Sequence, residues 1–389
     1  MQKNFLENIK NYKVFKKIRL RLSGDIISLK PHGKARGNVL LSYITLPFVV
    51  KDIVLDGHTN RWESREITNI FRERGYSVDV IEWTNTNFIP KKKYVYFFDI
   101  HSNMERLTPL LNKDCIKIFH ATTSHWKFQN TAAQKRLNDL QERKGVLIQT
   151  IRNLSSSRAT EYADFISLIG NEATANTYAF VKEKITRIPL STTHTYPSPT
   201  KKNFERAKNN FIWFGGSGMV HKGLDLVLEA FVDMPEYRLT VCGKVSNEKD
   251  FVEVYKKELY ETPNINVVGL IDPGSREFKK LCDSSIALVY PSCSEGQSGA
   301  VVTTMHAGLI PIISYQSGVD VEDFGIILKE SSIEEIKKAV RVISSLPLEE
   351  ISRRAMKTWQ YAREHHTREK FASAYRAFIN MIEKNKKIT

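Results

Sequence analysis

Two glycine-rich segments in the second half of the chain have residue types that bind phosphate. The first, Phe211–Phe231, has the pattern of a strand, a glycine-rich turn and the start of a helix. Its turn contains Gly215, Gly216 and Gly218, which let the backbone approach a ligand closely. Lys222 follows where the helix begins, so backbone amides and an ammonium group can converge on a phosphate.

The first segment matches neither of the common nucleotide-binding patterns. His221 stands where the dinucleotide pattern has its third glycine, no acid ends the next strand at the expected place, and the Walker pattern is absent. We therefore expect no hydride transfer. By itself, a glycine-rich turn after a strand is equally consistent with an ordinary tight turn.

The second segment, Leu288–Ile313, strengthens the interpretation of a ligand site. A buried strand ends at Pro291, a loop of small residues carries the acid Glu295, and an apolar helix follows. The residues Gly296–Gly299 would present successive N–H groups at the start of that helix. This is a second site for an anion or a hydroxyl at the same edge of the same sheet.

The elements around both segments alternate between strand and helix patterns. From Asn38 onward, short β-branched and aromatic runs alternate with helical patterns, which is typical of βαβ units and parallel sheets. The strands predicted in the first half are Val39–Ile44, Ser77–Trp83, Tyr94–Ile100, Ile116–His120, Val146–Thr150, Phe165–Ile169 and Ile185–Ile188. Those predicted in the second half are Phe211–Phe214, Arg238–Cys242, Ile265–Val268, Ile286–Tyr290, Ile310–Ser314 and Gly325–Leu328. Ser191–Asn203 reads as a linker. We predict an α/β protein of two doubly wound, Rossmann-like domains facing across a cleft, with ligand at the carboxyl ends of the strands.

The second half resembles the donor-binding domain of the retaining GT-B glycosyltransferases, the group 1 transferases that use nucleotide-sugar donors. The resemblance is carried by Gly-Gly-x₅-Lys-Gly-Leu-Asp-x₃-Glu-Ala-Phe at Gly215–Phe231, by Pro-Ser-x₂-Glu-Gly at Pro291–Gly296, and by Met305-x-x-Gly308. The resemblance is strong from Asn209 to Ser314 and weaker in the closing helix. In the first half it is limited to the general arrangement of the elements. It implies an acceptor-side domain (38–195), a donor domain (196–366) and a helix that crosses back to the N-terminal domain (367–389), and these follow a basic amphipathic segment (1–37) indicated by charge and apolar spacing.

The resemblance implies roles for individual residues. Lys222 would bind the donor diphosphate and Glu295 would face the donor sugar, and together with His120 they are the candidate catalytic residues. The candidate donor-binding residues are Gly215, Gly216, Ser217, Gly218, Gly296, Gln297, Ser298, Gly299 and Thr303. No Asp-x-Asp motif occurs, so we expect no metal and no cofactor beside the nucleotide-sugar substrate. Lys222 and amide dipoles would stabilise the leaving group.

Two positions depart from the family pattern. Thr303 stands where the family has a second acid, and Ser217 stands where it has an arginine. The hydroxyl of Thr303 can still meet a ribose, but Ser217 replaces neither the charge nor the fork of a guanidinium. Losing one charged hydrogen bond would weaken donor binding by roughly 1.5–3 kcal/mol. Either another cation compensates, or the protein is an impaired transferase that acts as a carbohydrate-binding or scaffolding subunit.

The first half offers candidates for the acceptor side. Asp56–Trp62 resembles the family's glycine-rich acceptor loop and supplies Gly57, His58 and Thr59. Ile118–Trp126 contains His120, which matches a family histidine near the reacting sugar or is an ordinary strand-end histidine. From the same stretch, His125 and Trp126 line the acceptor side or merely pack. Asn171, Glu172 and Thr174 follow another strand and are further candidates.

The predicted reaction moves a sugar, with retained anomeric configuration, from a nucleotide-diphosphate donor to a carbohydrate or lipid-linked glycan. The family suggests bacterial surface polysaccharide or lipopolysaccharide synthesis. No clear base is present. Glu295 as a nucleophile and the leaving phosphate as proton acceptor both stay open.

The charge of the chain is concentrated near its start. The 389 residues carry a formal net charge of +15, and about half of the excess lies between Met1 and Val39. Apolar residues are interleaved there at helical spacing, which fits either binding to an anionic membrane surface or a solvated helix packed on the protein. Zinc-finger and ribonucleoprotein motifs are absent, so we expect no nucleic-acid partner.

Composition also limits the compartment. The apolar stretch Val39–Val50 is too short to span a membrane, and the first residues lack the pattern of a secretory signal. The four cysteines are far apart, which indicates neither a zinc knuckle nor a dithiol site and fits a reducing compartment. We expect a cytoplasmic protein, peripheral on the inner face of the plasma membrane.

Overall fold

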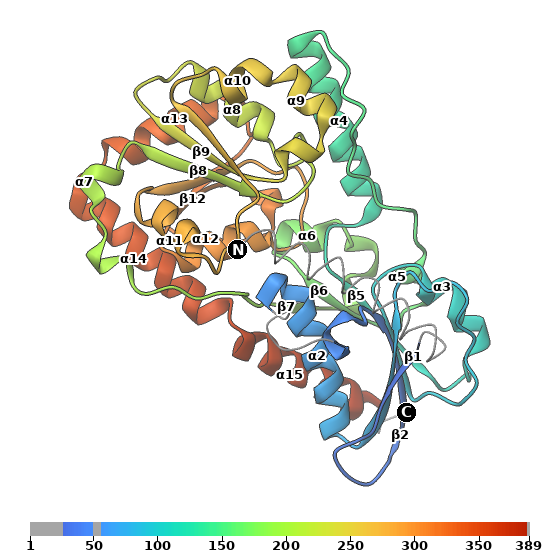
Figure 1. Ribbon diagram of the computed structural model, residues 1–389. Coiled ribbons are helices and arrows are strands. Elements are labelled where there is room, and N and C mark those ends of the chain that lie inside the picture. The colour runs from blue at the N-terminus through green and yellow to red at the C-terminus, as the bar shows by residue number, and fades with distance from the viewer. Residues whose placement is uncertain (1–25, 50–55, 387–389) are drawn as a thin grey trace.

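The computed structural model describes residues 26–49 and 56–386 and contains two β-sheets flanked by helices (Figure 1). The predicted α/β architecture of two Rossmann-like domains is confirmed. Most of the predicted basic segment, residues 1–25, lies outside the described residues.

The N-terminal domain is built on a seven-stranded sheet with the order β1-β3-β2-β4-β5-β6-β7. β1 runs antiparallel to β3, and the other pairs are parallel. Its strands are β1 (Ile26–Leu29), β2 (Gly37–Tyr43), β3 (Tyr76–Glu82), β4 (Tyr96–Asp99), β5 (Ile116–Ala121), β6 (Phe165–Ile169) and β7 (Ile185–Ile188). Its helices are α2 (Thr59–Glu73), α3 (Asn103–Leu107), α4 (Trp126–Lys144), α5 (Ala159–Tyr162) and α6 (Glu172–Asn176).

Alternating side chains of β2 fill separate cores on the two faces of this sheet. Val39 and Leu41 belong to the core that contains Ile67 of α2. Leu40, between them, belongs to the core that contains Met104 of α3. This period of two is what a strand buried on both faces requires.

The C-terminal domain has a six-stranded, fully parallel sheet with the order β10-β9-β8-β11-β12-β13. Its strands are β8 (Asn210–Gly215), β9 (Arg238–Gly243), β10 (Ile265–Gly269), β11 (Ala287–Tyr290), β12 (Ile310–Ser314) and β13 (Ile326–Leu328). The helices that follow the linker are α7 (Phe204–Ala207), α8 (Leu224–Val232), α9 (Lys249–Val254), α10 (Lys256–Tyr260), α11 (Arg276–Asp283), α12 (Gly299–His306), α13 (Ile333–Ser345), α14 (Leu348–His365) and α15 (Arg368–Lys386).

This strand order places the two glycine-rich segments side by side. The order reverses between β8 and β11, and ligands of open α/β sheets bind at such a switch point. Phe211 and Ile212 of β8 pair with Ala287 and Leu288 of β11. The glycine-rich turn that follows β8 and the Glu295 loop that follows β11 therefore leave the sheet as neighbours.

The strand predictions hold with one error and one omission. Val146–Thr150 has the composition of a strand but forms none, because this segment leaves the N-terminal sheet and bonds to Asp250 of the other domain. β1 was not predicted, since its four residues lie within the segment assigned to the basic N-terminus. The N-terminal sheet therefore begins before the predicted boundary at residue 38.

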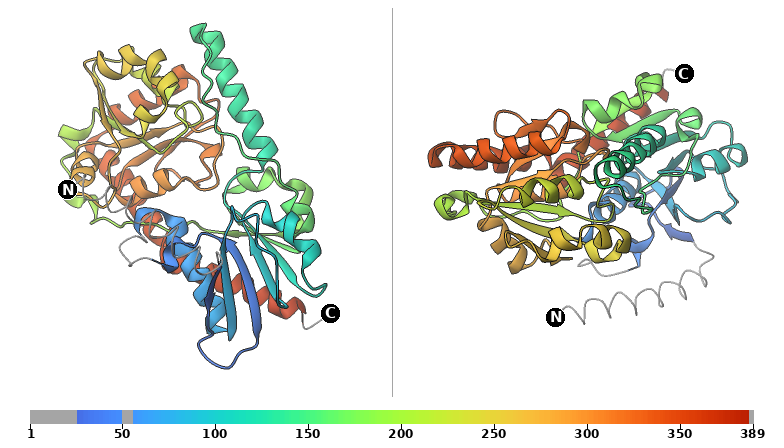
Figure 2. Two further views of the ribbon diagram at one scale, coloured as in Figure 1. Left: turned by 45° about the vertical axis from the view of Figure 1, so that its right-hand side comes forward. Right: turned by 90° about the horizontal axis from the view of Figure 1, so that it is seen from above.

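The C-terminal helix crosses back to the N-terminal domain, as predicted. α15 packs against α2 and β7, and Figure 2 shows it running beside the N-terminal sheet. Arg376 of α15 pairs with Glu66 at 3.0 Å and Glu73 at 2.9 Å, both on α2. Tyr375 of α15 is completely buried beneath these contacts.

Gly223 fixes the approach of the glycine-rich turn to the Glu295 loop. It caps α8 in the left-handed region, with a φ of 69°. A Cβ there would lie 2.6 Å from Cγ and 2.7 Å from the carbonyl oxygen of Pro291. Only glycine fits both the backbone angle and the space.

We predict that Gly223→Ala lowers the free energy of unfolding by about 2 kcal/mol, through backbone strain and collision with Pro291. Gly216→Ala is the matched control, because no heavy atom lies within 4 Å of its Cβ position. The control should change the free energy of unfolding by less than about 0.5 kcal/mol. Urea denaturation of both variants measures the difference, and equal effects would contradict this interpretation.

Candidate active site

A buried ion pair joins the two glycine-rich segments. The ammonium of Lys222 contacts the carboxylate of Glu295, and both side chains are at most 10% exposed. Lys222 Nζ also donates to the hydroxyl of Tyr290 at 2.8 Å, and that hydroxyl donates to Glu295 Oε1 at 2.9 Å. Ser292 Oγ donates to the same oxygen at 3.2 Å. The candidate catalytic lysine and acid are thus brought together at the predicted edge of the sheet.

Burial disfavours the charged forms of Glu295 and Lys222, and the opposite charge of each favours the charged form of the other. Burial opposes ionisation of Glu295, but Lys222 and Arg152 hold its pKa well below the usual range. Burial lowers the pKa of Lys222, and the charge of Glu295 opposes that shift. Burial also lowers the pKa of His221 to about 4, so this ring is neutral at pH 7. The pairing therefore favours the ionised carboxylate of Glu295, and that carboxylate in turn favours the charged form of Lys222.

The glycine-rich turn is held by an internal acid. The backbone amides of Gly218 and Met219 donate to the carboxylate of Glu248, at 2.5 and 2.9 Å. The predicted phosphate contact of the Gly218 amide is thus taken by a protein carboxylate in this structure. Gly216 and Ser217 are exposed on the same turn, and Gly215 is buried beneath it.

The Glu295 loop is pressed against the N-terminal domain. Ser124 Oγ donates to the carbonyl of Glu295 at 2.8 Å, and Thr174 Oγ1 donates to it at 3.4 Å. A Cβ on Gly296 would lie 2.3 Å from the carbonyl oxygen of Thr122. Gln297 Oε1 accepts from the amide of Leu190 at 2.6 Å. Gly296 and Gln297, predicted to bind donor, therefore make contacts between the domains.

The remaining donor candidates lie on and before α12. Ser298 is its N-cap, and the Ser298 amide donates to the carbonyl of Ser317 at 2.9 Å. Gly299 begins the helix and is half-buried, and Thr303 is buried one turn further on. The Ser298 amide is thus already bonded, so the predicted row of amides aimed at one ligand is incomplete.

A guanidinium from the N-terminal domain lies at the glycine-rich turn, and sequence reasoning missed it. Arg152 Nη1 donates to the carbonyl of Ser217 at 3.4 Å. Arg152 belongs to the segment after the residues mispredicted as a strand, so no local signal marked it. Tyr290 was also missed, because its position at a strand end reads as a core residue.

His120, predicted to be catalytic, lies apart from the Lys222–Glu295 pair in this structure. The side chain is completely buried in the N-terminal core, among the rings of Tyr43, Phe98 and Tyr375. Its Nδ1 is 2.9 Å from Ser167 Oγ. Burial lowers the pKa of His120 to about 3. The alternation of side chains along a strand explains this placement, since this residue of β5 points toward Tyr375 of α15.

The acceptor-side candidates fall into two groups. Gly57, His58 and Thr59 lie at the start of α2, where His58 is the N-cap and accepts from the Asn60 amide at 3.3 Å. Desolvation and the neighbouring cations Arg61, Arg152 and Lys244 lower the pKa of His58. His58 therefore shares one charged neighbour, Arg152, with the ion pair.

His125 and Trp126 line a cavity of about 200 Å³ in the N-terminal domain. The cavity walls include the aromatic side chains of Trp83, Phe119 and Tyr178. Trp126 Nε1 donates to the carbonyl of Ser157 at 3.0 Å, and the ring of His125 packs edge-on against Tyr178. Ser124 also lines the cavity and bonds the Glu295 loop, so the cavity adjoins the domain contact.

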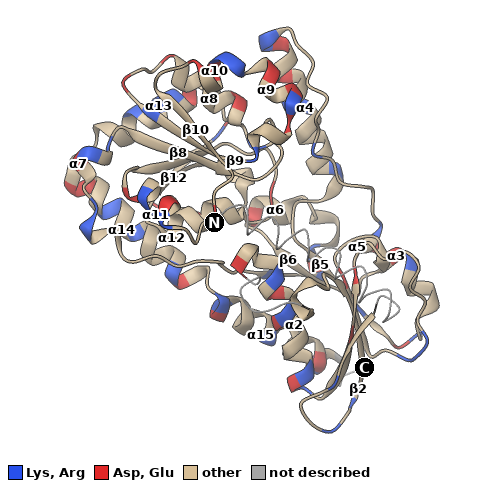
Figure 3. Cartoon of the chain, viewed as in Figure 1, with Lys and Arg blue, Asp and Glu red and all other residues tan. Residues whose placement is uncertain are grey.

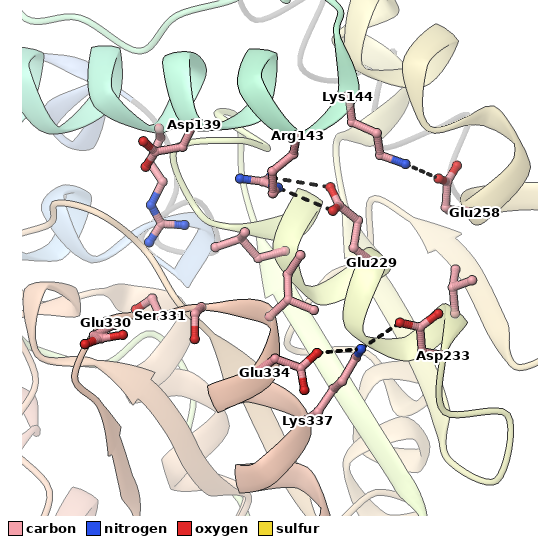
Figure 4. Close-up of a pocket in the computed structure, with 15 residues that line it drawn as sticks. Asp139, Arg143, Lys144, Glu229, Asp233, Glu258, Glu330, Ser331, Glu334 and Lys337 are labelled. Carbon is pink, nitrogen blue, oxygen red and sulfur yellow. Dashed lines mark hydrogen bonds and ion pairs between the residues drawn. The ribbon is translucent and has the colours of Figure 1, made fainter.

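Helix α4 ties the domains together on another side. Charged residues of both signs line α4 and the helices that face it (Figure 3). Arg143 pairs with the fully buried Asp225 at 2.7 Å and with Glu229 at 3.3 Å, and Lys144 pairs with Glu258 at 2.7 Å. Figure 4 shows Arg143, Lys144, Glu229 and Glu258 at a cavity of about 780 Å³ between α4, α8 and α13. The cavity's charged groups are largely paired with each other.

Residues 26–49 and 56–386 contain neither a candidate metal centre nor a candidate membrane span. No three His, Cys, Asp or Glu side chains lie together as metal ligands would. No helix in the same ranges is long and apolar enough to cross a membrane.

Comparison with known proteins finds a similarity for the C-terminal domain. Residues 198–365 match the family described as glycosyl transferases group 1. No curated protein sequence matches the chain.

Several solved structures share the two-domain architecture. Sucrose-phosphate synthase from Thermosynechococcus elongatus has a TM-score of 0.62 and 13% identity, over 90% of this chain and 99% of that one. HepE from Anabaena, solved with UDP and glucose, has a TM-score of 0.55 and 10% identity, over 89% and 98%. TarM from S. aureus has a TM-score of 0.51 and 13% identity. That match covers 72% of this chain and 54% of TarM. At these identities the similarity shows the fold.

We predict that Arg143→Ala lowers the free energy of unfolding by about 3 kcal/mol, because it removes the ion pair of the buried Asp225 carboxylate and leaves Arg136 as the nearby cation. Lys135→Ala is the control, since it removes the exposed pair with Asp139 on the same helix. That change should cost less than about 0.5 kcal/mol. Thermal or urea denaturation compares the two, and similar values would show that α4 does not clamp the domains energetically.

Proposed function

We propose that this chain transfers a sugar from a nucleotide-diphosphate donor to a glycan or glycolipid, because residues 198–365 match the group 1 glycosyl transferases and the two domains have the GT-B fold. The observation that carries the proposal is the buried Lys222–Glu295 pair at the switch point of the C-terminal sheet. In this arrangement Lys222 meets the departing diphosphate and Glu295 faces the donor sugar.

The geometry supports leaving-group stabilisation by protein cations. An ammonium held by Glu295 and Tyr290 keeps a fixed position, so it loses little freedom when a diphosphate arrives. We propose that the reaction needs no metal and retains anomeric configuration. The ionised state of Glu295 suits either a nucleophile or an electrostatic partner of the developing sugar cation, with the leaving phosphate accepting the acceptor's proton.

The acceptor side of the proposal rests on the cavity that His125 and Trp126 line. Aromatic walls suit the apolar face of a sugar ring or of a lipid-linked glycan, and about 200 Å³ suits one ring rather than an extended chain. A bacterial surface polysaccharide or lipopolysaccharide is the proposed product class.

One observation favours a second candidate, a carbohydrate-binding or scaffolding protein of the same fold. Glu248 occupies the amides of Gly218 and Met219, and Ser217 and Thr303 lack charge. Such a protein would bind glycan without binding a nucleotide sugar. A donor screen separates the two.

We expect calorimetry with a panel of nucleotide sugars to find at least one donor that binds, and acceptor to release free nucleotide from it, also with a chelator present. Lys222→Ala should weaken donor binding about 10- to 100-fold, the equivalent of one charged hydrogen bond. Lys208→Ala, on an exposed pair with Glu205, is the control and should bind as the unaltered protein does. Glycan binding without any donor binding would favour the scaffolding protein.

We further propose that the basic N-terminal segment holds the enzyme on an anionic membrane surface. Residues 1–25 contain seven basic and two acidic residues. Each cation near anionic headgroups contributes on the order of 1 kcal/mol, so removal of residues 1–25 should weaken binding to phosphatidylserine-containing vesicles more than tenfold. Vesicle co-sedimentation measures this, with neutral vesicles as the control. Equal binding by both chains would exclude the segment as the anchor.

A further inference from the structure

We propose that Arg152 is a second diphosphate-binding cation of the donor site, supplied by the N-terminal domain, so that a bound donor bridges the two domains. This inference rests on the proposed function, since it takes the ligand to be a nucleoside diphosphate. It concerns a residue that the glycine-rich turn itself does not contain.

Arg152 lies along the exposed side of the glycine-rich turn. Its Nη1 bonds the carbonyl of Ser217, and its Cδ is 3.2 Å from the position a Cβ would take on Gly218. The side chain itself is exposed. A ligand at the turn can therefore reach the guanidinium. When the guanidinium turns to the ligand, water can take its place at the Ser217 carbonyl.

A diphosphate needs a positive charge in this site beyond that of Lys222. The charge of Lys222 is already matched by Glu295, so the pair alone offers a diphosphate little net attraction. Within the described residues, no carboxylate forms an ion pair with Arg152. A planar guanidinium can also bind two phosphate oxygens at once, which the Ser217 hydroxyl cannot do.

The backbone around Arg152 is held before any ligand binds. On one side, Asp250 of α9 accepts from the amides of Gln149 and Thr150, at 3.0 and 2.7 Å, and from the Thr150 hydroxyl at 2.7 Å. On the other side, the Asn130 side chain of α4 bonds both the amide and the carbonyl of Leu154 at 2.8 Å.

These bonds fix the segment from both domains. Asp250 belongs to the C-terminal domain and Asn130 to the N-terminal one. The guanidinium is thus presented at the turn only while the domains stay in contact, and a diphosphate bound to Lys222 and Arg152 would favour that contact. Donor binding and domain closure are therefore coupled through one side chain.

The test measures binding of UDP, GDP, ADP and dTDP, and of the matching nucleosides, by calorimetry. Arg152→Ala should weaken binding of the preferred diphosphate about 10- to 100-fold and leave nucleoside binding unchanged, and Arg152→Lys should restore only part of the loss. Arg158→Ala is the charge-matched control, because Arg158 lies in the same segment, is exposed and pairs with Glu161. It should bind as the unaltered protein does.

Hydrogen exchange tests separately whether the bound diphosphate strengthens the contact between the domains. Hydrogen exchange of residues 145–158 should slow when the diphosphate binds the unaltered protein, and should not respond in Arg152→Ala. If the diphosphate binds and Lys222→Ala weakens it while Arg152→Ala does not, the role of Arg152 is overturned and the proposed function stands. If no nucleoside diphosphate binds the unaltered protein, both proposals fall.

Discussion

The ion pair between Lys222 and Glu295 is the constraint on which the site depends. Two charges that are almost fully buried are tolerated only when they are paired and further hydrogen-bonded, and Tyr290 and Ser292 supply those bonds. The pair also requires two loops from different strands to meet, which Gly223 permits by its close approach to Pro291. The order of the strands, the position of Gly223 and the opposite charges of the two side chains therefore all contribute to the Lys222–Glu295 contact.

The same contact connects the two domains. The Glu295 loop receives hydrogen bonds from Ser124 and Thr174, and Arg152 reaches the opposite loop at Ser217. Each half of the ion pair thus has neighbours in the N-terminal domain. A change in the relative position of the domains would alter the field at Lys222 and Glu295, because Arg152 contributes to it. This is a physical route by which closure can prepare the site.

The sequence interpretation and the structure differ at three places, each for its own physical reason. Val146–Thr150 has a strand's residues, but its backbone partners lie on Asp250 of the other domain, and no local pattern reports a partner so distant in sequence. His120 ends a strand as a site residue would, but its side chain points into the face that Tyr375 covers. β1 escaped notice because Ile26–Leu29 is short and follows a basic run.

The sequence by itself determined the alternation of strands and helices, the two glycine-rich segments, and the place of Lys222 and Glu295 at strand ends. These features depend on local spacing, which hydrophobic periodicity and glycine reveal. Only the tertiary structure decided that Arg152 lies beside Ser217, that Glu248 holds the Gly218 amide, and that His120 is buried. Those contacts join elements that the chain order does not place together: Arg152 meets Ser217 between the domains, Glu248 meets Gly218 within the C-terminal domain, and α15 covers His120 in the N-terminal one.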